Sequence, residues 1–153
     1  MKPSERGGLP LPQAAGKRVA IVSARFYGTL ADWLEDGAAR GLEACGVAAA
    51  DRPIYHVPGC FELPLAAQRL IESGYDAVVA LGVVVRGETP HFDYVAGECS
   101  RGIMEVQLAL GAPVGFGVLT TDTFGQAEER ADPARGDKGY DAALAALTVL
   151  MLV

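Results

Sequence analysis

The sequence predicts a three-layer α/β/α sandwich, doubly wound around a mainly parallel core sheet of four strands. Strand-like and helix-like segments alternate four times along the chain, and most strand-like segments are apolar nearly throughout. A strand that is apolar on both faces is typical of a parallel sheet covered by helices on both sides. Regular alternation of strands and helices favours right-handed crossovers between neighbouring strands. The 153 residues correspond to one domain, at roughly 100–200 residues per domain.

The expected strands are residues 18–26 (RVAIVSARF), 53–57 (PIYHV), 75–85 (YDAVVALGVVV) and 113–121 (PVGFGVLTT). The expected helices begin near residues 29, 61, 91, 127 and 139, and the third covers residues 91–110. The first places Leu30, Leu34, Ala38, Leu42 and Cys45 on one stripe, and such spacing predicts an amphipathic helix. We expect Gly46 to end it, and Pro64 to stand in the first turn of the second.

Residues 1–16 are rich in proline and glycine, so we expect an extended N-terminal arm, disordered or laid on a neighbour, before a single domain at 17–153. The sequence shows no signal-peptide pattern, and its longest apolar run, 142–153, is shorter than the ~20 residues of a membrane span. The three cysteines, Cys45, Cys60 and Cys99, follow no disulfide or metal-ligand spacing. Free thiols in a reducing compartment, and hence a cytoplasmic protein, are expected.

The net charge is −6, from 13 basic and 19 acidic side chains. Non-specific nucleic-acid binding needs a basic face, and the chain has no Lys/Arg-rich run, so we expect no nucleic-acid partner. At 50% hydrophobic residues the chain is also too apolar to be disordered. We therefore expect a globular protein that binds any phosphate group through a few local residues and not through a basic surface.

In doubly wound sheets, ligands bind beyond the carboxyl ends of the strands. Polar and aromatic residues gather at these four ends, in residues 25–28, 57–62, 85–91 and 119–122. The loop RGETPH leads from a strand into a helix, where free amides and the positive end of the helix dipole can hold a phosphate. The same residues can also simply form a turn and a helix cap. The chain contains neither the P-loop pattern nor GxGxxG.

His91, at the expected start of a helix, can move protons near neutral pH, or can be ordinary polar surface. Phe26 and Phe61 end successive strands and can either stack on a flat ring or serve as core aromatics. Glu62 can accept hydrogen bonds from a polyol or favour the helix start. His56, inside an apolar strand, is expected to be a hydrogen-bonded core or interface residue. The residues alone thus indicate a site for a small ligand that is partly aromatic and partly phosphorylated.

Six motifs, in order, make the chain resemble the 6,7-dimethyl-8-ribityllumazine synthase family, over about residues 19–147. They are ARF (24–26), PGCFELP (58–64), YDAVVALGVVVRGETPHFDYV (75–95), GFGVLTT (115–121), QAEERA (126–131) and DKG (137–139). The resemblance implies a flavodoxin-like fold. It also implies condensation of 5-amino-6-ribitylaminouracil with 3,4-dihydroxy-2-butanone 4-phosphate, with neither metal nor organic cofactor.

By this resemblance, Phe26 stacks on the pyrimidine, the backbone of Val83, Val84 and Val85 reads its polar edge, and Phe61 and Glu62 meet the ribityl chain. The amides of Gly87, Glu88 and Thr89 hold the phosphate together with Arg130. His91 is the implied acid/base. Tyr27 departs from the pattern, since many members carry Asn at this position near the ribityl chain.

The resemblance further implies a pentamer with active sites between adjacent subunits, in which a neighbour supplies Phe116, Arg130 and Lys138. The C-terminal segment AALAALTVLML is apolar all round, which favours a covering partner surface. A free pentamer and an icosahedral capsid of pentamers both remain open, as does an enclosed riboflavin synthase. The alternative functions are a lumazine- or flavin-binding paralogue with weak catalysis, or a protein that acts mainly as a shell.

Overall fold

The structure is a computed structural model that describes residues 7–153, in which four parallel strands form one sheet in the order β2-β1-β3-β4. The strands are β1 (Val19–Ala24), β2 (Ile54–Val57), β3 (Ala77–Val85) and β4 (Val114–Thr121). This order is the beginning of the flavodoxin-like order, with the chain running in two directions from β1. The predicted doubly wound parallel sheet is therefore confirmed.

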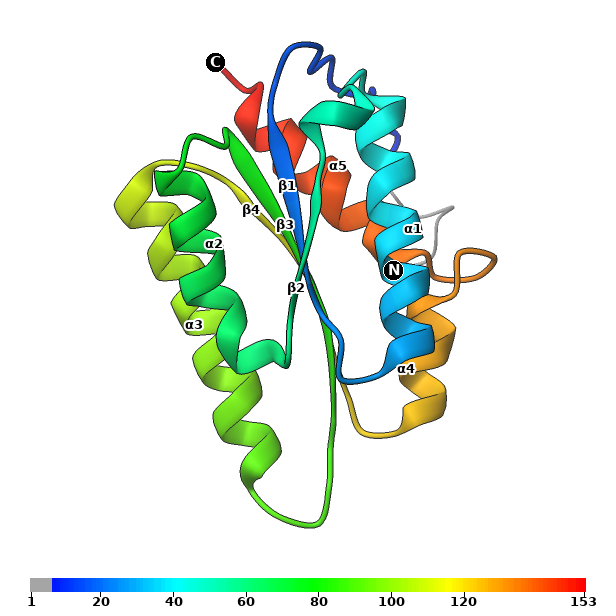
Figure 1. Cartoon of the computed structure of the whole chain (residues 1–153). Coiled ribbons are helices and arrows are strands. Elements are labelled where there is room, and N and C mark those ends of the chain that lie inside the picture. Colours follow the sequence, from blue (N-terminus) through cyan, green and yellow to red (C-terminus); the bar gives the residue numbers. More distant parts are fainter. Residues whose placement is uncertain (1–6) are drawn as a thin grey trace.

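Helices cover both faces of the sheet (Figure 1). The helices are α1 (Gly28–Ala44), α2 (Leu63–Glu72), α3 (His91–Leu110), α4 (Phe124–Ala131) and α5 (Lys138–Leu150), with short 3₁₀ turns η2 (Ala49–Asp51) and η3 (Cys60–Glu62). Helices α2 and α3 pack on one face, and α1, α4 and α5 pack on the other. The three layers predicted from the sequence are present.

The central strand β1 shows why its sequence is apolar throughout. Val19 and Ile21 pack into the cluster under α1 and α5, whereas Ala20 and Val22 pack into the cluster under α2 and α3. Successive side chains of a strand point to opposite faces, so a strand covered on both sides buries every residue. All six residues of β1 are buried.

Strand β2 differs from the expected apolar core strand, because it pairs only with β1 and forms an edge of the sheet. Ile54 and Tyr55 are exposed. The side chain of His56 is 54% exposed, with Nε2 3.1 Å from Oε1 of Glu35. The predicted hydrogen bond is present. Of the two positions expected for His56, the core position is wrong, since one side of an edge strand has no neighbouring strand, and the interface position stays a prediction.

Helix α5 buries one face closely against α1. At Gly139, an added Cβ would lie 2.2 Å from the carbonyl oxygen of Leu34, so only glycine permits this approach. Val149 and Leu152, at the end of the chain, are exposed. The C-terminal segment, which is apolar all round, therefore has hydrophobic side chains that the single chain does not cover.

Part of the expected N-terminal arm, residues 1–6, lies outside the described residues. Within the remainder, Ala14 is buried and its N–H donates to the carbonyl of Cys45 at 2.8 Å. Ala14 thus caps the end of α1 against the core. Among the described helices, none is both long enough and apolar enough to span a membrane.

Candidate active site

A cavity of about 610 Å³ opens at the carboxyl ends of the strands. Its walls come from the β1–α1 connection, η3, the end of β3 and the start of α3, and include Phe26, Phe61, Val84, Thr89 and His91. All these elements meet at the same end of the sheet, because parallel strands have their carboxyl ends on one side. The structure therefore brings together residues that lie far apart in the chain, such as Phe26 and His91, which are 65 positions apart.

Two aromatic rings are presented in this cavity instead of being buried in the core. Phe26 is 73% exposed and Phe61 is 60% exposed, and both line the cavity. Tyr27, the residue before α1, supports Phe26 edge-to-face with ring centroids 4.9 Å apart, and packs in turn on Phe124 at 5.5 Å. Exposed ring faces of this kind can stack on a planar ligand.

The end of β3 extends past β1, and on that side its backbone edge faces the same cavity without a paired strand. Pairing of β3 with β1 ends at Leu81, whereas its pairing with β4 continues to Val85. Val83, Val84 and Val85 line the cavity. Because every strand residue carries one N–H donor and one C=O acceptor, this extension can hydrogen-bond the polar edge of a flat ligand.

The loop after β3 projects beyond the sheet before the chain turns into α3 (Figure 1). Gly87 and Thr89 line the cavity, as does His91, the first residue of α3, whereas the intervening Glu88 is exposed and does not. Pro90 precedes the helix, and the first helical N–H, that of His91, donates to Oγ1 of Thr89 at 3.4 Å. The first amides of a helix and its dipole favour an anion here, and His91 lies within the same wall.

Glu62 takes part in local structure while facing the cavity. Its Oε1 accepts a hydrogen bond from the Gly59 N–H at 3.0 Å, which closes the turn η3. A carboxylate has two oxygens and about four acceptor positions, so a ligand hydroxyl can also donate to it. Both interpretations of Glu62 made from the sequence are therefore compatible with its position.

Cys60 also lines the cavity but is 5% exposed. Burial raises the pKa of its thiol to about 12, with a smaller contribution from the neighbouring Cys99. A thiol with this pKa is protonated at neutral pH and is a poor nucleophile. Cys60 therefore contributes shape to the cavity.

Three further predicted site residues lie away from this cavity. Phe116 is exposed on β4, and Lys138 begins α5, 3.4 Å from Oδ2 of Asp141. Arg130 donates to the carbonyl of Gln126 at 3.0 Å and lines a second cavity, of about 420 Å³, between the end of β4 and α4. The structure thus assigns the predicted residues to different surfaces of the chain.

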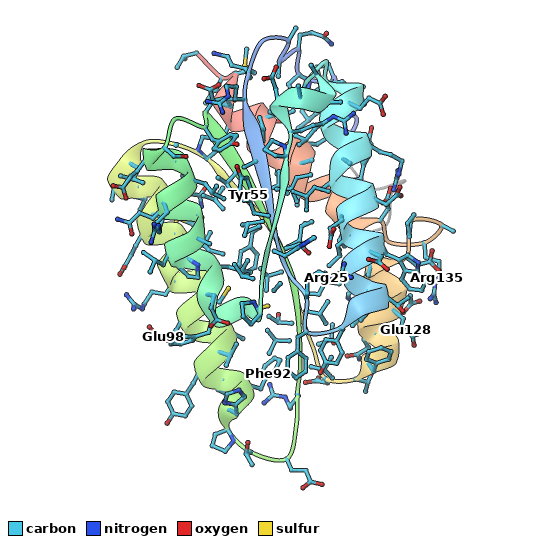
Figure 2. All side chains as sticks on the ribbon, viewed as in Figure 1. Arg25, Tyr55, Phe92, Glu98, Glu128 and Arg135 are labelled. Carbon is cyan, nitrogen blue, oxygen red and sulfur yellow. The ribbon has the colours of Figure 1, made fainter. Side chains whose placement is uncertain are left out.

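Sequence reasoning missed three residues of α3 that line the first cavity. They are Phe92, Tyr94 and Val95. Tyr94 and Val95 follow His91 by three and four positions, the spacing that places side chains on one helix face. This spacing was present in the sequence and could have indicated Tyr94 and Val95 as residues of the cavity. Phe92 is labelled in Figure 2, at the start of α3 beside the strand ends.

The described residues contain no group of three or more His, Cys, Asp or Glu side chains arranged to hold a metal ion. The first cavity instead combines aromatic faces, an open strand edge, a helix N-terminus and one histidine. Fold and site together define the class of doubly wound α/β proteins with a cavity at the strand ends, and this cavity can hold a small planar, anionic ligand.

Comparison with known proteins narrows this class. The family model for 6,7-dimethyl-8-ribityllumazine synthase matches residues 16–153. A protein of that name from Desulfatibacillum aliphaticivorans is 49% identical over 140 residues, which cover 91% of this chain and 90% of the relative. The chain belongs to the 6,7-dimethyl-8-ribityllumazine synthase family.

Proposed function

We propose that this chain is a transferase that condenses 5-amino-6-ribitylaminouracil with 3,4-dihydroxy-2-butanone 4-phosphate. The products are 6,7-dimethyl-8-ribityllumazine, phosphate and water, and the reaction is the penultimate step of riboflavin synthesis. Family membership over residues 16–153 supports the reaction. The observation that supports the location of the active site is the cavity that Phe26, the end of β3 and His91 line together.

The pyrimidine substrate fits the aromatic side of the cavity. Phe26 stacks on its ring, and the backbone of residues 83–85, which β1 does not pair, hydrogen-bonds its polar edge. Phe61 and Glu62 contact the ribityl chain. Tyr27 contacts Phe26 edge-to-face and also lines the cavity, so in this chain it both supports the stacking ring and lies within reach of the ribitylaminouracil.

The phosphorylated substrate fits the opposite wall. Amides of Gly87, Glu88 and Thr89 and the N-terminus of α3 bind its phosphate, and Arg130 of an adjacent subunit adds a charge-assisted hydrogen bond. Holding both substrates turns a bimolecular step into an effectively unimolecular one, worth up to about 7–11 kcal/mol of the barrier. His91 moves protons during imine formation, phosphate elimination and ring closure.

The separate surfaces support an assembly with active sites between subunits. Phe116, Arg130 and Lys138 do not line the first cavity of their own chain, which is compatible with their proposed role in the cavity of a neighbour. The exposed hydrophobic side chains, among them Leu108 and Leu152, favour burial between subunits. We propose a pentamer located in the cytoplasm. Light scattering separates a free pentamer from an icosahedral capsid, and copurification tests riboflavin synthase as an enclosed partner.

The direct test mixes purified protein with both substrates and follows the fluorescent product together with released phosphate. We expect equal amounts of product and phosphate, and neither when one substrate is omitted. The variant Arg130→Ala serves as the matched control. Its fold should stay intact, since the side chain is exposed. Its turnover should be slower, because the phosphate of the substrate loses a charge-assisted hydrogen bond. Ligand binding without turnover by the unaltered protein would instead favour a binding paralogue.

A further inference from the structure

Arg86 lies at the junction of three elements around the phosphate-binding loop. It directly follows β3, and its backbone N–H donates to the carbonyl of Thr121 at 2.9 Å. Its Nε donates to Oδ1 of Asp122 at 2.8 Å, just beyond the end of β4. The same guanidinium therefore connects the beginning of the loop to the neighbouring strand.

The other side of this guanidinium faces α3. Its Nη1 donates to Oδ1 of Asp93 at 3.3 Å, and Cζ lies 4.4 Å from the ring centroid of Phe92. Phe92 also lines both cavities. Loop 87–90 begins directly after Arg86 and is followed, in the first turn of α3, by Phe92 and Asp93, which the Arg86 side chain contacts. One side chain therefore connects the two ends of the loop.

We propose that Arg86 is a positioning residue: it clamps the ends of loop 87–90 between Asp122 and the first turn of α3, and thereby orients the phosphate-binding amides and His91. This inference rests on the proposed function of that loop. Arg86 lines the second cavity and not the first, so it acts through the backbone of the loop. A planar guanidinium suits this position because it can bond two carboxylates while stacking on a ring.

The variant Asp122→Asn separates positioning from a direct charge effect. A direct contact between Arg86 and phosphate predicts tighter phosphate binding in this variant, since a negative charge beside the arginine is removed. Positioning predicts the opposite, because a neutral side-chain amide at position 122 would hold the guanidinium less strongly than the carboxylate does.

The test measures the dissociation constant of inorganic phosphate by calorimetry, and kcat and KM for each substrate. Arg86→Met and Asp122→Asn should both weaken phosphate binding and raise KM for the phosphorylated substrate, by about tenfold for Arg86→Met. The double variant should be no worse than Arg86→Met alone, since the two residues act as one clamp. KM for the pyrimidine should stay within about twofold of the original value.

Arg101→Met is the matched control. Arg101 lies on the same helix as Phe92, bonds the two carboxylates Glu98 and Glu105, and is 57% exposed, compared with 47% for Arg86. We expect the Arg101→Met protein to bind inorganic phosphate with the same dissociation constant as the unaltered protein.

Two results would overturn the inference: phosphate binding in Arg86→Met equal to that in Arg101→Met, or tighter binding in Asp122→Asn. Absence of condensation by the unaltered protein is a different result and overturns the proposed function instead.

Discussion

Subunits damaged on different surfaces of a shared site should restore one another's activity when they assemble together. Phe26→Asp places a carboxylate where the pyrimidine is proposed to stack, and Arg130→Glu reverses the charge that is proposed to reach a neighbour's phosphate. Both side chains are exposed, so the folded subunit loses little stability on their replacement. Each variant assembled alone should have almost no activity.

The expected recovery follows from the two-surface arrangement. In a random mixture of equal amounts, a site is intact when its cavity comes from an Arg130→Glu subunit and its arginine from a Phe26→Asp subunit. Each condition holds for half of the subunits, so about one quarter of the sites of a closed ring should be intact. Sites contained within single chains would give no recovery.

The assay is product formation after the two variants are unfolded together and refolded as a mixture. A mixture of Phe26→Asp with Phe61→Asp is the matched control, because both lesions lie in the same cavity and every cavity then carries one. We expect no recovery in this control. Activity of the test mixture no greater than that of the separately refolded variants would refute a site shared between the two surfaces.

Three further predictions concern catalysis, packing and ionisation. His91→Ala should lower kcat by about 10²-fold without abolishing turnover, and a kcat equal to that of the unaltered protein would remove His91 from the mechanism. Gly139→Ala should lower the free energy of unfolding by about 1–3 kcal/mol, because its Cβ meets the carbonyl of Leu34. Gly125→Ala, with no atom within 4 Å of its added Cβ, should show no such loss in the same denaturant titration. Burial raises the pKa of Cys60 to about 12, so the unfolded chain releases this proton first and the free energy of unfolding should fall as pH rises from about 9 toward 12. A Cys60→Ser variant with the same pH dependence would contradict this assignment.

Much of the fold is encoded in local patterns that need no knowledge of contacts. The bounds of α3, residues 91–110, agree with the sequence prediction, because Pro90 and the left-handed Gly111 mark its ends chemically. Strand β1 was equally clear, since two-sided burial leaves an uninterrupted apolar run. Strand β2 was predicted as a strand and is present, but its exposure was not predicted, because only the strand order places it at an edge.

The sequence by itself determined the alternation of strands and helices, the carboxyl end of the sheet as the place of the cavity, and the family to which the motifs point. The tertiary structure decided which predicted residues share a cavity. It placed Phe26 and His91 in one cavity and Arg130 in a second one, and it revealed the hydrogen bonds of Arg86 to Asp122 and Asp93. Local patterns report only the burial and geometry of neighbouring residues. Distances between residues far apart in the chain depend on strand order and helix packing, and these exist only in the folded protein.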